Sequence, residues 1–172
     1  MPDVADIAAV DEKQAAAVFA RHLKGLKSVV LAVSGGSDSI ALMRLVARWD
    51  RGLETGARLN LHVVTVDHRL RPDSAAETEF VLREAHSVGL TGEKLSWDGP
   101  HPETGVSAAA REARYSLMAE VCRRRDAVLV TAHTLDDQAE TLVMALARGA
   151  GVDGLSAMQV HTQFKGLTIV RP

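Results

Sequence analysis

One stretch near the N-terminus constrains the fold more than any other part of the sequence. The apolar residues 29–33 run directly into a loop of serine, glycine and aspartate at 34–39, and apolar residues then recur at helical spacing over 40–49. A short continuous apolar run is typical of a strand that is buried on both faces, as in a parallel sheet. The sequence therefore predicts a strand, a tight loop and a helix, in that order, within an α/β domain.

The loop has the features of a phosphate-binding turn. Gly35 and Gly36 can adopt positive φ angles, and they lack the Cβ atoms that would hold an anion away. The first N–H groups of the following helix have no partner within the helix and point at the same place. Because Asp38 would repel a bare anion, a nucleotide with Mg²⁺ fits better than free phosphate. The alternative is a tight turn in which Asp38 and Ser39 only cap the helix.

The remaining apolar segments alternate with amphipathic segments along the chain. Helices are expected near residues 11–25, 38–51, 74–89 and 107–125, and buried strands near 27–33, 59–66, 93–97, 127–131 and 167–170. Strand, helix and strand in succession give a right-handed crossover between parallel strands. We therefore expect an α/β fold, a Rossmann-like parallel sheet of about five strands with helices on both faces.

Composition limits the classes of function. The length of 172 residues suits one domain, and a net charge of −2 lacks the basic excess of a self-sufficient nucleic-acid binder, so that any RNA contact must be local. The single cysteine, Cys122, excludes an internal disulfide and cysteine-pair metal sites, and it favours a reducing cytoplasm. The start of the chain does not resemble a signal peptide, and no apolar run reaches membrane length, so we expect neither export nor a membrane span.

Two further groups of residues are candidates for chemistry. His133, Asp136, Asp137 and Glu140 follow a predicted strand and place four ionisable groups within about two helical turns. Their spacing fits metal or base chemistry but is not a zinc signature, and helix capping is the alternative.

The second group is a pair of arginines on the longest predicted helix. Arg111 and Arg114 are three residues apart on one helical face, where they can grip one anion together. The alternative is a solvated pair that exchanges contacts with Glu112 or Glu120.

Several of these segments carry a family resemblance. Residues 34–39 match the S-G-G-x-D-S signature of the PP-loop, or N-type, ATP pyrophosphatases, which cleave ATP between the α and β phosphates and release pyrophosphate. Within that group the chain resembles the tRNA(Ile)-lysidine synthetases in order along nearly its whole length, at residues 34–39, 66–71, 110–115, 131–141 and 148–151. The one departure is Thr134, where a second histidine is common.

The resemblance implies an adenine nucleotide alpha hydrolase-like fold and a reaction. ATP would activate the C2 oxygen of the wobble cytidine in tRNA(Ile) with a CAU anticodon, and the ε-amine of L-lysine would then displace AMP to give lysidine. By this resemblance Asp38 works with Mg²⁺, Arg111 and Arg114 steady tRNA or developing phosphate charge, Asp137 positions the lysine ammonium or a metal, and His133 is a further catalytic candidate. The expected ATP-binding residues are Ser34, Gly35, Gly36, Ser37, Asp38 and Ser39.

The resemblance also indicates how much of the protein this chain covers and which other functions compete with the first. Residues 1–172 would form a single PP-loop ATP pyrophosphatase domain, and relatives continue past the equivalent of Arg171-Pro172 into domains that help to bind tRNA, so a truncated chain is expected. A homodimer is an open prediction. The rival functions are a tRNA thiolase of the same fold, which would normally use cysteines, and a nucleotide-binding module that acts through a partner.

Overall fold

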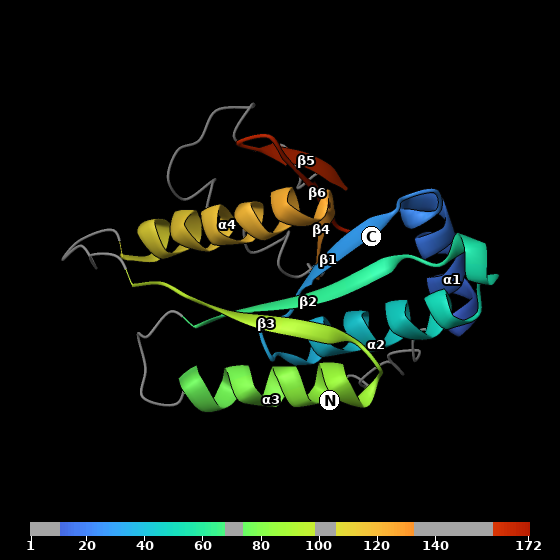
Figure 1. The fold of residues 1–172 in the computed structure, drawn as a ribbon, viewed down its shortest axis with the longest axis horizontal. Helices are drawn as coiled ribbons and strands as arrows, with labels where there is room; N and C mark the ends of the chain where they lie inside the picture. Colours follow the sequence, from blue (N-terminus) through green and yellow to red (C-terminus); the bar gives the residue numbers. More distant parts are fainter. Residues whose placement is uncertain (1–10, 68–73, 99–105, 133–159) are drawn as a thin grey trace, which may run out of the picture.

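A six-stranded sheet forms the centre of the computed structural model, which describes residues 11–67, 74–98, 106–132 and 160–172, with the side chains of 106–108 left out (Figure 1). The strand order is β3-β2-β1-β4-β6-β5. All neighbouring strands are parallel except β5 and β6, which form an antiparallel hairpin. The strands are β1 (Ser28–Ala32), β2 (Asn60–Asp67), β3 (Thr91–Ser96), β4 (Val128–Thr131), β5 (His161–Phe164) and β6 (Leu167–Val170).

Helices cover both faces of the sheet, as the sequence predicts. They are α1 (Glu12–Leu23), α2 (Ser37–Arg51), α3 (Ser74–Ser87) and α4 (Val106–Arg125), with a short 3-10 helix, η1 (Thr55–Ala57). The alternation of side chains along β1 shows which helix covers which face. Val29 and Leu31 pack in one core cluster with residues of α1, α2 and α3, whereas Val30 packs in a second cluster with residues of α4.

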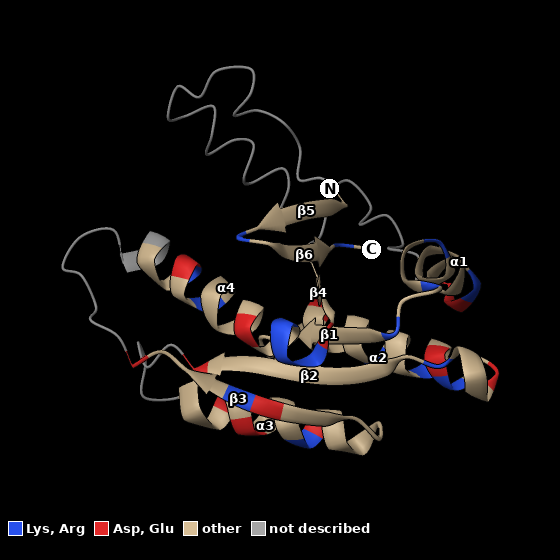
Figure 2. Ribbon diagram, turned by 45° about the horizontal axis from the view of Figure 1, so that its top comes forward, with Lys and Arg blue, Asp and Glu red and all other residues tan. Residues whose placement is uncertain are grey.

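Most charged residues of the described parts lie outside this core, although Asp50, Asp67 and Arg171 are buried. Figure 2 shows that Lys, Arg, Asp and Glu gather on the helices and on β3, while β1 and β4 carry none. Strands β1 and β4 are therefore buried on both faces, which explains their continuous apolar sequences.

The strand order reverses beside β1. From β1 the chain builds outward through β2 to β3, then returns to the other side of β1 as β4. The loop that follows β1 opens at this reversal, between the carboxyl ends of β1 and β4. In open α/β sheets ligands bind at such a switch point.

The sequence missed one strand, and the bounds of another differ by one or two residues from those expected. Strand β5 was not expected, because His161–Phe164 contains a single apolar residue and lies at the edge of the sheet. Strand β3 begins before its predicted start and ends at Ser96, and Trp97, which was expected to be its last residue, is buried beyond the strand. Edge strands need less apolar sequence than central ones, so their periodicity is weaker.

Candidate functional site

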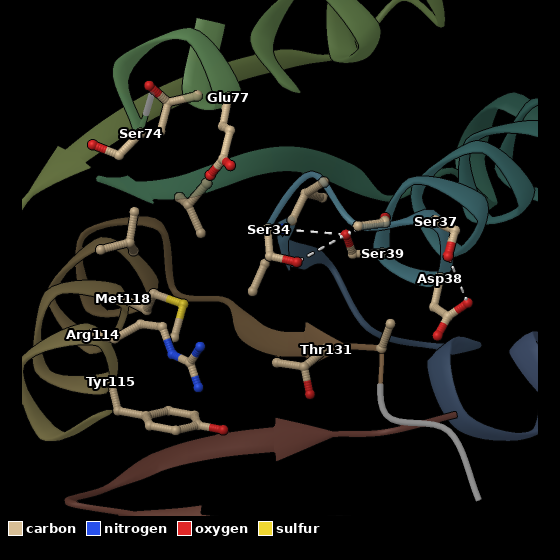
Figure 3. A pocket seen from close by; sticks show the side chains of 17 residues that line it. Ser34, Ser37, Asp38, Ser39, Ser74, Glu77, Arg114, Tyr115, Met118 and Thr131 are labelled. Atoms are coloured by element: carbon tan, nitrogen blue, oxygen red, sulfur yellow. Dashed lines mark hydrogen bonds between the residues drawn. The ribbon is translucent and has the colours of Figure 1, made fainter. Parts of the chain in front are cut away.

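A cavity of about 520 Å³ lies at the carboxyl ends of β1, β2 and β4 (Figure 3). This volume is within the range of small-molecule sites. Its floor and walls come from four parts of the fold. They are the loop with the start of α2 (Ser34, Gly36, Ser37, Asp38, Ser39), the strand ends (Ala32, Val33, Val64, Val66, Thr131, Ala132), α3 (Ser74, Glu77, Thr78) and α4 (Arg114, Tyr115, Met118).

Ser39 closes the loop on itself. Its Oγ donates to the carbonyl oxygen of Gly36 at 2.9 Å and accepts from the backbone N–H of Ser34 at 3.2 Å. The Oγ atoms of Ser34 and Ser39 lie 3.3 Å apart as well. Because Ser39 is buried, these bonds fix the loop from the inside and leave its outer side to a ligand.

Gly35 and Gly36 give the loop its shape. Gly35 has a φ angle of +94°, a conformation that other residues adopt only with strain. Gly36 is the N-cap of α2 and provides no side-chain cap. The first N–H groups of α2, which have no acceptor within a helix, are thus presented to the cavity without a competing side chain. Neither Asp38 nor Ser39 is the N-cap, so the capping alternative does not describe this loop.

Asp38 stands exposed in the first turn of α2. Its Oδ1 accepts from Ser37 Oγ at 3.3 Å, and both side chains line the cavity. Within the described ranges no three His, Cys, Asp or Glu side chains gather at one point. An accessible carboxylate beside a loop whose backbone suits phosphate is nevertheless a donor set that fits Mg²⁺, which usually takes one or two carboxylates with substrate phosphates and water.

The two arginines of α4 are placed differently. Arg114 is half-buried and lines the cavity, and Figure 3 shows its guanidinium pointing inward beside Tyr115. Arg111 is exposed and is not among the described residues that line the cavity. Glu112 pairs with Lys165 Nζ at 2.7 Å, and this lysine lowers the pKa of Glu112. The geometry thus brings one of the two arginines to the site.

The opposite wall joins the end of β2 to the start of α3. Asp67, the last residue of β2, is buried and accepts from Ser74 Oγ at 2.7 Å. Ser74 is the first residue of α3, and this bond ties the start of the helix to the end of the strand. Glu77 in turn lines the cavity from the first turn of α3.

Part of the predicted site lies outside the described residues. This applies to His133 and Asp137, to the segment 68–71 and to 148–151. Thr131 and Ala132 line the cavity, and His133 is the next residue in the sequence.

The sequence did not single out the apolar and aromatic lining. Val64, Val66 and Met118 give the cavity an apolar wall, and Tyr115 lies beside Arg114. The position of Val64 and Val66 near the carboxyl end of a predicted parallel strand was the available signal. No local signal indicated Met118, because the face that a helix turns to a cavity depends on how it packs on the sheet.

Three comparisons relate the chain to known proteins. A PP-loop domain model matches residues 8–172. The tRNA(Ile)-lysidine synthase of Bradyrhizobium diazoefficiens is 51% identical over 168 residues, 97% of this chain and 46% of that protein. The synthase of the same name from Rhodopseudomonas palustris is 48% identical over 167 residues, 94% of this chain and 48% of that protein. The chain thus spans about half the length of these relatives.

A solved structure shares the fold. The U34-tRNA thiolase NcsA from Methanococcus maripaludis, determined with its [4Fe-4S] cluster, superposes with a TM-score of 0.74 at 16% identity, covering 92% of this chain and 58% of that one. At this identity the likeness concerns the fold alone. Since the family model matches residues 8–172, nearly the whole sequence, the chain belongs to the PP-loop domain family.

Proposed function

We propose that the chain is the ATP-activating part of a ligase that modifies tRNA(Ile). The reaction would adenylate the wobble cytidine of a CAU anticodon and join L-lysine to it, giving lysidine, AMP and pyrophosphate. The observation that carries the proposal is the similarity to two proteins named tRNA(Ile)-lysidine synthase over almost the entire chain. The PP-loop cavity supplies a place for ATP.

The lining of the cavity suits the parts of ATP. Backbone N–H groups of the loop and of the first turn of α2 would hold the phosphates. The apolar wall of Val64, Val66 and Met118 would take the adenine ring. Asp38 would hold Mg²⁺, which supplies neutralisation of the phosphate charge. Arg114 would meet the negative charge that develops on the far side of the cavity.

The chemistry follows from this placement. The C2 oxygen of the cytidine forms a bond to the α-phosphorus of ATP. The bond from this phosphorus to the oxygen that bridges the α and β phosphates breaks, and pyrophosphate leaves. Negative charge then spreads over the α-phosphate and the leaving group, where the loop N–H groups and Arg114 stabilise it. The lysine ε-ammonium, with Asp137 as its predicted partner, gives up a proton to solvent. The resulting amine attacks C2, and the C2–O bond breaks as AMP departs, with His133 as a further predicted participant.

The remaining proposals concern where and with what the protein works. Burial raises the pKa of the Cys122 thiol to about 12, which keeps it protonated and supports neither a disulfide nor a sulfur relay. This favours the synthetase over the thiolase and agrees with a cytoplasmic protein. No helix in the described parts is long and apolar enough to cross a bilayer. A homodimer stays a prediction.

Pyrophosphate release tests the proposal. The chain is incubated with ATP, Mg²⁺, lysine and a tRNA(Ile) transcript with a CAU anticodon, and each component is omitted in turn. We expect ATP binding by calorimetry, and slow pyrophosphate release that requires the tRNA and is lost with a GAU anticodon. ATP binding without any release would identify a nucleotide-binding module, and sulfur transfer to the tRNA would identify a thiolase.

A further inference from the structure

An aromatic cluster lies between the cavity and the β5–β6 hairpin. The ring of Tyr115 on α4 is 3% exposed and has a guanidinium carbon of Arg111 at 5.1 Å and of Arg114 at 5.4 Å from its centroid. Both distances are within the range of a cation–π interaction. One ring thus attracts two like charges and reduces the repulsion of holding them near each other.

The hairpin holds this ring from behind. Phe164, the last residue of β5, packs on Tyr115 with ring centroids 5.3 Å apart and planes tilted by 43°. The next residue, Lys165, lies 5.5 Å from the Phe164 ring and pairs with Glu112 of α4 at 2.7 Å. A ring contact and an ion pair therefore fasten the hairpin to the same turn of α4 that carries the arginines.

The ring matters because arginine side chains are long. A free guanidinium must lose rotamer freedom before it can meet an anion, which weakens binding. Arg114 points into the cavity while its guanidinium rests beside a ring that is itself buried (Figure 3). Much of the ordering is therefore already done in the protein without ligand.

We propose that Tyr115 is a positioning residue, which holds the guanidinium of Arg114 toward the phosphate groups in the cavity, and that Phe164 keeps the ring of Tyr115 in place. Through this contact the β5–β6 hairpin sets the affinity of the cavity for a polyphosphate. The proposal deepens the proposed function and rests on it, since the anion is the phosphate chain of ATP.

Inorganic pyrophosphate is the probe, because it carries the charge without the nucleoside. Its affinity is measured by calorimetry for the wild-type chain, Tyr115→Phe and Tyr115→Leu. The strength of a cation–π contact at an exposed or partly buried site corresponds to about a three- to tenfold change in a dissociation constant. Tyr115→Leu should therefore bind pyrophosphate about three- to tenfold more weakly than the wild type. Tyr115→Phe keeps the ring and should bind within about twofold of the wild type. Equal affinity of the Phe and Leu variants would overturn the proposal.

Two further variants separate positioning from general destabilisation. Phe19→Leu removes a ring that is 4% exposed in the other core cluster, and it should lower the melting temperature without changing pyrophosphate affinity. Phe164→Leu should weaken pyrophosphate binding in the same direction as Tyr115→Leu, and it replaces that variant if Tyr115→Leu does not fold.

A double-mutant cycle shows whether Tyr115 acts through Arg114. If it does, adding Tyr115→Leu to Arg114→Gln should weaken pyrophosphate binding little beyond Arg114→Gln alone. Additive losses would overturn the positioning role.

A measurement on the unliganded chain separates the failure of this proposal from the failure of the proposed function. The Nε–Hε resonance of Arg114, assigned by its absence in Arg114→Gln, should be displaced by the ring in the wild type and in Tyr115→Phe, and should return to an ordinary position in Tyr115→Leu. If the wild type binds neither ATP nor pyrophosphate, the proposed function fails, and this resonance alone decides the placement of Arg114. An undisplaced resonance in the wild type would refute it.

Discussion

Ser39 and Asp38 are neighbours in the sequence with opposite surroundings. Ser39 is buried, and its hydroxyl bonds to the backbone of the loop. Asp38 is exposed and lines the cavity. Ser39 therefore shapes the loop, and Asp38 is accessible to a ligand in the cavity. Changes at Asp38 should affect chemistry more than structure.

Replacing Asp38 by asparagine tests this division. The backbone N–H groups that would hold the phosphates remain, and a negative charge that repels them is removed, so the ATP dissociation constant should stay within roughly threefold. Pyrophosphate release should fall by at least about tenfold, because the carboxylate for Mg²⁺ is lost. Calorimetry and a pyrophosphate assay measure the two quantities. Glu54→Gln, an exposed acid near the other end of α2, is the matched control, and unchanged turnover in Asp38→Asn would remove Asp38 from the site.

His62 shows how burial decides the state of a titratable residue. It is 4% exposed on β2, with Nδ1 at 3.0 Å from Thr91 Oγ1 and Nε2 at 3.1 Å from Glu93 Oε1. These contacts suit a neutral ring that donates from Nε2 to the carboxylate and accepts at Nδ1 from the hydroxyl. Burial first, and then the charge of Arg125, lower the pKa of His62 in spite of Glu93.

This lowered pKa predicts a loss of stability in mild acid. Below the ordinary histidine pKa of about 6.5 the unfolded chain binds a proton that the folded chain resists, so the free energy of unfolding should decrease as the pH falls from 7.5 to 5.5. His62→Gln should show a shallower decrease, because this proton no longer distinguishes the two states. Urea titrations at both pH values measure it. Parallel pH profiles for the two proteins would mean that His62 does not contribute.

At the level of elements, apolar runs made the central strands predictable. Strands β1, β2, β4 and β6 were located within one or two residues, because burial on two faces demands continuous apolar sequence. Strand β5 escaped because its pairing with β6 through the turn at Lys165 and Gly166 depends on backbone conformation, with φ angles of +47° and +80°. Such a hairpin has no periodic side-chain pattern to reveal it.

The candidate site, like the sheet, was predictable from the sequence only in part. A loop between a buried strand and a helix indicated where an anion would bind, and the cavity lies there. Arg111 and Arg114 were expected to act together, since their spacing puts them on one helical face. Only Arg114 lines the cavity, because the orientation of α4 on the sheet, which local sequence does not encode, turns Arg111 toward the surface.

Gly92 of β3 lies where Leu82 of α3 and the backbone of β2 leave no room for a side chain. A Cβ atom at this position of β3 would lie 2.9 Å from Leu82 Cδ2 and 3.1 Å from the carbonyl oxygen of Val63. Gly92→Ala should therefore push α3 away from the strand and lower the free energy of unfolding by about 1–3 kcal/mol. Gly56→Ala is the control, because a Cβ there meets nothing within 4 Å. Equal unfolding midpoints in denaturant for the two variants would contradict this account of the packing.

In the described parts of the chain, positive charges are spread over the four helices, with three consecutive arginines at the end of α4, and are partly compensated. Figure 2 shows acidic and basic residues interspersed on the helices. Several of these charges form ion pairs between elements. Arg44 of α2 pairs with Glu84 of α3, and Arg124 Nη2 of α4 lies 3.2 Å from Glu93 Oε2 of β3. These pairs offset part of the positive charge in the described parts of the chain.

This distribution predicts weak tRNA binding by the 172-residue chain, whose net charge is −2. Each phosphate contact to single-stranded RNA contributes about −0.7 to the slope of log affinity against log salt, so two or three contacts imply only about a tenfold loss between roughly 50 and 200 mM salt. Titration of labelled tRNA(Ile) at these two concentrations measures the slope, and ATP binding in the same samples shows that the chain is folded. Arg111→Gln should reduce the slope by less than about one unit. Tight binding with a loss of about a thousandfold would instead place an extensive RNA-binding surface within these residues.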